Sequence, residues 1–269
     1  MERLWNAKKV VVACAAAFVI GIGAGLYISS ANYFSQERPP KIDLATIDGT
    51  LRCLSDDSIE AVRTSGSIDV VFPKCVQELR VALGDEFKKV SDESLRAVLA
   101  TVVASNFAEY GASSALSFED IKNANHLNCA NTIFLVGYLL DAFDSENLQP
   151  IGFDGGAIGN HAQLLFKESG ETVLLDPTAG LIAKTNFDDL LRGVPVSQSK
   201  IRTFSIKDKS KSINSSRERV YIAIQRGEYR PSDFMYMHES LAELKSRGSS
   251  NSYFTPGGIA VRTKLKIQS

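Results

Sequence analysis

The chain has 269 residues, of which 44% are hydrophobic and 23% are charged, a composition typical of a globular protein with one sizeable core. Its formal net charge is -1 at pH 7. This balance excludes the strongly basic character that nucleic-acid binding usually requires, so we expect no nucleic-acid partner.

The first predicted element is an apolar run from Val10 to Ile28 that holds no charged residue. As a helix rising ~1.5 Å per residue, this run would span roughly 28 Å, the thickness of a bilayer core. Basic residues precede it, so the positive-inside rule favours a cytoplasmic N-terminus and an exported remainder. We therefore expect a single-pass membrane anchor at residues 10–30, a polar linker at residues 31–41 and an exported domain, periplasmic or extracellular, at residues 42–269.

Two other interpretations of the apolar run stay open. The small residues Ser29, Ser30 and Ala31 could precede a signal-peptide cleavage site, although the run is longer than the ~7–15-residue core of a signal peptide, which favours an anchor. Cys14 follows a short apolar stretch, as in a lipoprotein signal. The apolar run continues past Cys14, which disfavours lipidation.

The cysteines outside the predicted anchor are Cys53, Cys75 and Cys129. An exported domain is in an oxidising compartment, where a Cys53–Cys75 disulfide across a short loop would leave Cys129 as a free thiol. The alternative is that all three are buried, reduced cysteines.

Two helices are predicted in the middle of the chain. From Ser91 to Tyr110, a serine start signal, early acidic residues and apolar residues at helical spacing predict a helix that Gly111 ends. From Asn128 to Phe143, apolar residues occupy nearly every side, which predicts a buried helix too short to span a membrane. Asn128 is a natural N-cap, so Cys129 would open this helix.

A β-hairpin is predicted from residue 160 to residue 178, with its turn at Ser169 and Gly170. If Glu168 pairs with Glu171, Leu164 lies opposite Leu175 and one face of the hairpin is apolar. The other face then carries His161, Gln163 and Asp176, with Asp176 diagonal to His161. A shift of the register by one residue would move Asp176 to the opposite face.

In the rest of the chain, we predict a short helix at residues 187–192, a solvated loop at residues 207–218 and a helix at residues 238–245. We find no repeat and no chemical motif in this part. The core of the domain is expected at about residues 91–195.

Along the chain, the predicted helix and hairpin carry a thiol, an imidazole and a carboxylate, in that order. A thiol attacks as the thiolate, which a helix N-terminus and a nearby histidine both favour. We therefore predict Cys129 as the nucleophile, His161 as the base and Asp176 as the group that orients the base. His126 and His238 are rival bases, but neither has an orienting carboxylate in the same pattern.

These residues resemble the transglutaminase-like superfamily, whose members are papain-like thiol enzymes. In that superfamily a Cys opens a central helix, a Gly-His-Ala-Trp-like strand follows, and a later strand ends in Asp-Pro-Thr. The matching segments here are Asn128 to Ala130, Asn160 to Gln163 and Leu174 to Thr178. The likeness covers roughly residues 91–180. This chain departs from the pattern at Asn160, where glycine is common, at Gln163, where an aromatic residue is common, and after Cys129, where no tryptophan follows.

The resemblance implies an α+β fold, in which a buried central helix packs on an antiparallel sheet. It also implies acyl chemistry at an amide or peptide bond through a thioacyl intermediate, and we expect a membrane-anchored cysteine protease or amidase. Its substrate would be a protein or peptide, with no cofactor and no metal.

Two alternatives to this enzyme remain. One is a catalytically silent transglutaminase-like binding or assembly module, which the altered flanking residues favour. The other is an arylamine N-acetyltransferase-like enzyme, which the absence of an Arg-Gly-Gly stretch before Cys129 disfavours.

Overall fold

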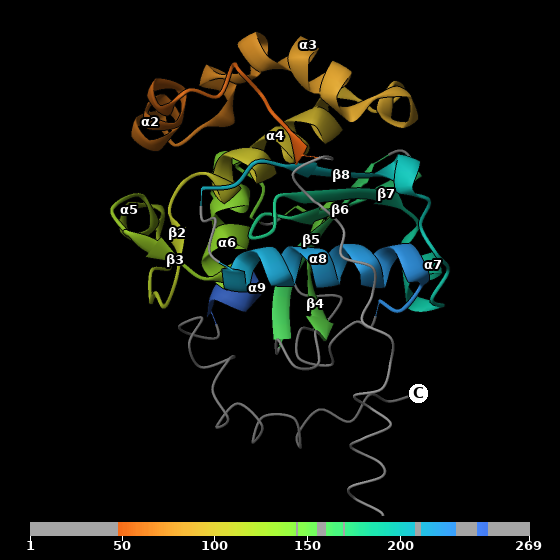
Figure 1. Cartoon of the computed structure of the whole chain (residues 1–269). Helices are drawn as coiled ribbons and strands as arrows, with labels where there is room; N and C mark the ends of the chain where they lie inside the picture. Colours follow the sequence, from red (N-terminus) through yellow and green to blue (C-terminus); the bar gives the residue numbers. More distant parts are fainter. Residues whose placement is uncertain are drawn as a thin grey trace, which may run out of the picture. The chain divides into compact units, whose positions relative to one another are not determined.

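The computed structural model describes residues 48–143, 145–154, 160–168, 170–207, 211–229 and 241–246 (Figure 1). The anchor and linker predicted for residues 10–41 lie outside these residues. Within the described part of the chain, no helix is both long and apolar enough to cross a membrane.

A six-stranded sheet forms the centre of the domain, in the order β1-β8-β7-β6-β5-β4. Strands β4 to β8 pair in antiparallel fashion, and β1 joins β8 in parallel. The strands are β1 (Asp48–Gly49), β4 (Leu148–Asp154), β5 (Asn160–Glu168), β6 (Glu171–Asp176), β7 (Leu181–Thr185) and β8 (Ile201–Phe204). A separate two-stranded parallel sheet consists of β2 (Glu109–Tyr110) and β3 (His126–Leu127).

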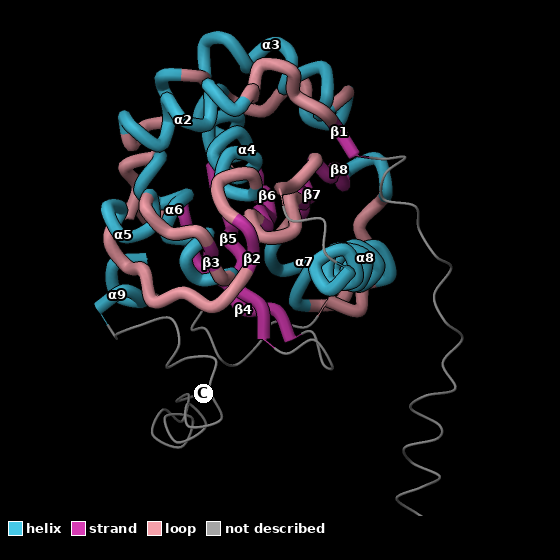
Figure 2. Tube along the Cα trace, turned by 60° about the vertical axis from the view of Figure 1, so that its left-hand side comes forward, coloured by secondary structure: helices cyan, strands magenta, loops and turns pink. Residues whose placement is uncertain are grey.

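Helices cover both faces of the larger sheet, as Figures 1 and 2 show. The helices are α2 (Asp56–Ser65), α3 (Phe72–Leu83), α4 (Asp92–Ser105), α5 (Phe118–Lys122), α6 (Cys129–Leu139), α7 (Phe187–Leu191), α8 (Lys211–Arg226) and α9 (Leu241–Ser246). Short 3-10 turns lie at Ile68–Val70, Asp85–Phe87 and Gln198–Lys200. Helices α4 and α6 pack on one face of the sheet and α8 crosses the other. The predicted α+β class is confirmed.

The predicted hairpin is β5 and β6, and its register is the predicted one. Glu168 pairs with Glu171, and Leu164 pairs with Leu175. Gly170 lies in the turn with φ of 82°, a left-handed conformation that suits glycine. The apolar face of the hairpin belongs to the buried cluster that also contains α4 and α6. That burial is consistent with the register, because a slip by one residue would move these apolar side chains onto the face that carries His161, Gln163 and Asp176.

Both predicted central helices exist, but each ends earlier than the sequence predicted. Ser91 caps α4, whose last residue is Ser105 rather than Tyr110. The Asn106 side chain donates to the Val102 carbonyl (2.9 Å) and to the Ser205 carbonyl (2.9 Å). The helix therefore ends where Asn106 contacts the residue that follows β8. Helix α6 ends at Leu139 rather than Phe143.

The prediction of a solvated loop at residues 207–218 is wrong from Lys211 onward, where α8 begins. The early part of α8 is mostly polar, but one face of the helix is buried at helical spacing. The residues of that face are Ile213, Arg217, Val220, Tyr221 and Ile224. The short helix predicted at residues 187–192 is α7, and the last predicted helix is seen as α9, with residues 238–240 outside the described part.

The cysteines behave as the sequence predicted. A disulfide joins Cys53, just before α2, to Cys75 in α3. Cys129 is a free, buried thiol. The disulfide therefore ties together the two helices that precede α4, and it leaves one thiol for chemistry in the described part of the chain.

Candidate active site

The start of α6 positions Cys129. The Asn128 side chain accepts hydrogen bonds from the backbone N–H groups of Ala130 and Asn131, both at 3.0 Å. Asn131 returns the interaction, because its Oδ1 accepts from the Asn128 N–H at 3.0 Å. This capping box makes Cys129 the first residue of the helix, where a backbone N–H has no acceptor within the helix.

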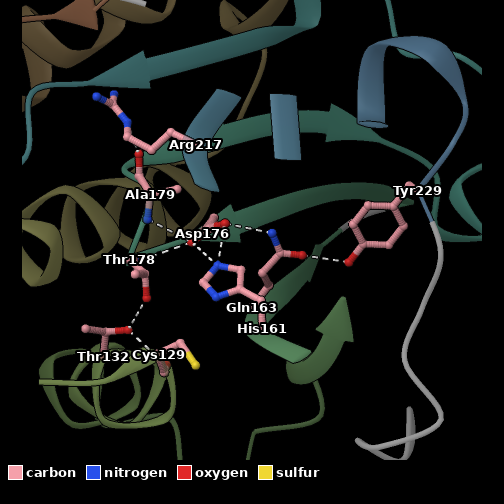
Figure 3. A network of polar contacts seen from close by, with 9 residues as sticks. All are labelled: Cys129, Thr132, His161, Gln163, Asp176, Thr178, Ala179, Arg217 and Tyr229. Carbon is pink, nitrogen blue, oxygen red and sulfur yellow. Dashed lines mark hydrogen bonds and ion pairs between the residues drawn. The ribbon is translucent and has the colours of Figure 1, made fainter. Parts of the chain in front are cut away.

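The hairpin positions His161 and Asp176 on one face. Nε2 of His161 lies 2.9 Å from Oδ1 and 2.8 Å from Oδ2 of Asp176 (Figure 3). The Asp176 side chain is fully buried, and His161 is 8% exposed. The pairing that the predicted register implied is therefore present.

The Cys129 thiol completes the group. Its sulfur lies at the start of α6, on the side of the His161 imidazole away from Asp176 (Figure 3). Because Nε2 of the ring faces Asp176, the imidazole lies between the carboxylate and the thiol. The structure brings together all three residues that the sequence predicted for the site.

Opposite charges decide how His161 and Asp176 ionise. Burial alone lowers the pKa of His161, but the Asp176 carboxylate and then Cys129 outweigh it and raise the pKa to about 10. Burial alone raises the pKa of Asp176, but the His161 charge and the hydrogen bonds to the carboxylate hold it below the ordinary value. The imidazole is therefore protonated and the carboxylate ionised at neutral pH.

The Asp176 carboxylate has donors besides His161. Nε2 of Gln163 donates to Oδ2 at 2.7 Å, and the backbone N–H groups of Thr178 and Ala179 donate to Oδ1 at 3.2 and 2.9 Å. A carboxylate with this many donors stays ionised even when buried. Gln163 was predicted on the face of the hairpin that carries the site, although no role was predicted for it.

Two residues from the C-terminal part of the chain support the site, and the sequence analysis missed both. The Tyr229 hydroxyl donates to Oε1 of Gln163 at 2.7 Å. Arg217 donates from Nε to the Ala179 carbonyl at 2.6 Å, and from its terminal nitrogen to the Phe204 carbonyl at 2.9 Å. The helical spacing of apolar residues around Arg217 could have predicted α8, but no local signal marks Tyr229.

Tyr110 is a further residue that the sequence analysis missed, because its segment was predicted as the end of a helix. Strand β2 pairs Tyr110 with Leu127 on β3, two residues before Cys129. This pairing brings the Tyr110 side chain close enough for Cys129 to act on the pKa of its phenol. Burial raises the pKa of Tyr110, and Cys129 and Asp176 raise it further, so the phenol keeps its proton and remains a donor.

Helix α6 is also tied to the turn after β6. The Thr132 hydroxyl donates to the Cys129 carbonyl at 2.9 Å and lies 3.0 Å from the Thr178 hydroxyl. Of the rival bases, His126 is exposed on β3, and His238 lies outside the described residues. Among the described residues, no group of His, Cys, Asp and Glu side chains could hold a metal ion.

Comparisons with family models, curated proteins and solved structures found no match to this chain.

Proposed function

We propose that the domain is a transglutaminase-like thiol enzyme that cleaves or transfers an acyl group through Cys129, His161 and Asp176. The observation that carries the proposal is the imidazole between a buried carboxylate and a thiol at a helix start. Such an arrangement serves nucleophilic catalysis on unrelated folds. A helix that packs on an antiparallel sheet and presents the thiol to two neighbouring strands supports a transglutaminase-like, papain-like core.

The chemistry follows from the charges of the three groups. The Cys129 sulfur attacks the carbonyl carbon of an amide, and a carbon–sulfur bond forms as the oxygen becomes an oxyanion. The carbon–nitrogen bond then breaks, and His161 gives its proton to the leaving amine. In the second half, His161 takes a proton from a water molecule as the water oxygen attacks the thioester carbon. The carbon–sulfur bond then breaks, which releases the acid and leaves the Cys129 thiolate beside protonated His161.

The oxyanion needs donors at the position where its charge develops. The Asn128 side chain occupies the N–H groups of Ala130 and Asn131, so those donors serve the helix cap and not the substrate. The Cys129 N–H and the Tyr110 hydroxyl are the donors next to the sulfur. We assign the oxyanion to this pair.

The substrate class we propose is a protein or peptide, cleaved by a cysteine protease or amidase. We further propose that the domain acts outside the cytoplasm, held by the anchor predicted at residues 10–30. The Cys53–Cys75 disulfide supports this location, because disulfides persist in oxidising compartments.

Alkylation of Cys129 by iodoacetamide at pH 6 tests the proposal. Alkylation requires a thiolate, which His161 stabilises as its partner cation, so His161→Ala should slow the reaction roughly tenfold at pH 6 and much less at pH 9. His126→Ala is a matched control, because it removes an exposed histidine three residues before Cys129. If the two variants give the same rate-against-pH profile, the proposal fails.

A catalytically silent transglutaminase-like binding or assembly module is the second candidate. Its support is the burial of the reacting groups, since Cys129 is only 3% exposed. This candidate predicts that the folded wild-type protein resists iodoacetamide at every pH, whereas the enzyme predicts reaction at pH 6.

A further inference from the structure

A chain of side-chain hydrogen bonds runs from the segment after α8 to the carboxylate of the site. The Tyr229 hydroxyl donates to Oε1 of Gln163 at 2.7 Å, and Nε2 of Gln163 donates to Oδ2 of Asp176 at 2.7 Å (Figure 3). Gln163 and Asp176 are fully buried, and Tyr229 is 3% exposed. Gln163 and Tyr229, which this series of hydrogen bonds joins, are 66 residues apart in the sequence.

The order of donors and acceptors allows only one orientation of the Gln163 amide. An amide side chain has an accepting oxygen and a donating nitrogen, whereas an ionised carboxylate only accepts. Burial and the charge of Asp176 raise the pKa of Tyr229 well above its ordinary value, so the phenol keeps the proton that it donates. A flipped amide would place its oxygen against the Asp176 carboxylate, an unfavourable contact between two buried acceptors.

Gln163 also decides how the two carboxylate oxygens are shared. Oδ1 of Asp176 accepts from the backbone N–H groups of Thr178 and Ala179, while Oδ2 accepts from Gln163. Each oxygen therefore has a donor other than His161, and the carboxylate plane is held from both sides. The titratable side chains that act on Asp176 are His161, Tyr110 and Tyr229.

We propose that Gln163 and Tyr229 are positioning residues of the thiol site, in which Tyr229 orients the Gln163 amide and Gln163 holds the Asp176 carboxylate toward His161. The inference rests on the proposed function. It makes the C-terminal segment after α8 a part of the reaction machinery, although that segment carries no chemical motif of its own. Gln163 also stands where the transglutaminase-like pattern commonly has an aromatic residue.

The experiment compares Gln163→Met, Tyr229→Phe and their double variant in the full chain, with 4-nitrophenyl acetate as the acyl donor. Gln163→Met keeps the bulk of the side chain but removes the amide donor, so we expect the acylation rate of Cys129 to fall about tenfold, as for other residues that orient reacting groups. Tyr229→Phe should lower the rate severalfold, and the double variant should match Gln163→Met, because Tyr229 acts through Gln163.

A second readout separates positioning from mere structure. Loss of the amide donor raises the pKa of Asp176, so the acid limb of the acylation profile should move to higher pH in Gln163→Met and, less strongly, in Tyr229→Phe. The matched control is Tyr138→Phe, which loses a 2.6 Å hydroxyl hydrogen bond to the Leu116 carbonyl away from the site. Its acid limb should stay at the wild-type pH.

The inference is overturned if the acid limb stays in place in both variants, or if it moves as far in Tyr138→Phe. If Gln163→Met does not fold, the inference requires that Tyr229→Phe alone moves the acid limb of the acylation profile to higher pH. A carboxyl NMR titration of Asp176 gives the same test without any substrate. Failure of the wild-type protein to be acylated would therefore count against the proposed function, while an unmoved Asp176 titration would count against this inference.

Discussion

The Cys129 sulfur has two polar neighbours whose roles differ. His161 is a cation at neutral pH, whereas Tyr110 is a neutral phenol that keeps its proton. Tyr110 as a whole residue is 42% exposed, so it lies at the surface as well as near the thiol. In the reaction we propose, its hydroxyl is a donor to the oxyanion.

Tyr110→Phe separates the two roles, because it removes the hydroxyl and keeps the ring. Acylation forms an oxyanion, so we expect its rate with 4-nitrophenyl acetate to fall on the order of a hundredfold. Alkylation by iodoacetamide forms no oxyanion, so its rate at pH 6 should change little. Equal losses in the two reactions would show that Tyr110 only supports the structure around the thiol.

The His161 and Asp176 pair predicts how stability depends on pH. The raised pKa of His161 makes its charge stabilise the fold fully below its unfolded pKa of ~6.5, and this contribution is lost as the pH rises toward 10. The lowered pKa of Asp176 stabilises the fold above its ordinary value of 3.8, and this contribution is lost as the pH falls. The excess stability of the wild type over Asp176→Asn, measured by urea unfolding, should therefore be greatest between about pH 4 and pH 6.5. A difference that does not vary from pH 3 to pH 10 would contradict this account.

The three residues of the candidate site could be predicted from the sequence because each has a local signal. Asn128 marks the start of the helix that Cys129 opens, and the alternation of the hairpin places His161 and Asp176 on one face. Tyr110 and Tyr229 could not be predicted as part of the site, since they meet it only through contacts between segments far apart in the chain. Their placement depends on strand β2 and on helix α8, which the sequence analysis did not predict.

Helix α8 carries none of the three candidate residues, but Arg217 ties it to the site. Arg217, 3% exposed, donates to the carbonyls of Ala179 and Phe204 and so joins α8 to the turn after β6 and to β8. The same turn supplies the Ala179 N–H to Asp176. The position of α8 is therefore coupled to the carboxylate through one residue of the turn.

Arg217→Met tests this coupling, because methionine keeps an unbranched side chain but cannot donate to the two buried carbonyls. We expect a loss of about 3 kcal/mol in the free energy of unfolding, since each hydrogen bond from a charged group is worth about 1.5–3 kcal/mol. Arg226→Met, at an exposed position of the same helix, should change stability by less than about 0.5 kcal/mol. Urea unfolding of the two variants measures the difference, and equal stabilities would rule out the anchoring role of Arg217.

The elements show which sequence signals decide structure. The hairpin register could be predicted because it pairs Leu164 with Leu175 and Phe166 with Val173, which gathers these apolar residues on one face. The end of α4 could not be predicted from spacing alone, because it depends on a contact of Asn106 with the distant Ser205 carbonyl. Helix α8 was missed for a different reason, because its polar first turns masked the helical spacing of Ile213, Val220 and Ile224.

At the scale of the whole molecule, the α+β class was predicted as what the resemblance to the transglutaminase-like superfamily implies. The N-terminal helices and the strands β1 and β8 could not be predicted. Strand β1 pairs with β8, so this contact joins opposite ends of the domain. The buried residues extend from Leu51 to Leu244, so nearly all of the described chain contributes to the fold around the site.

The location that we propose for the domain, outside the cytoplasm, rests on the anchor predicted at residues 10–30 and on the Cys53–Cys75 disulfide. We expect a reporter enzyme that works only outside the cytoplasm to be active when it is fused after Lys41. The same fusion with residues 10–28 deleted is the control and should be inactive. Activity of a cytoplasmic reporter at Lys41 would overturn the proposed location.

The most direct test of the account is mass spectrometry of the protein after brief reaction with 4-nitrophenyl acetate. We predict a single acetyl adduct on Cys129 in the wild type, no adduct at that position in Cys129→Ser, and a strongly slowed adduct in His161→Ala and in Asp176→Asn. An unmodified Cys129 in the folded wild type, or equal acylation in all but the Cys129→Ser variant, would contradict the claim that the three residues act as one thiol site.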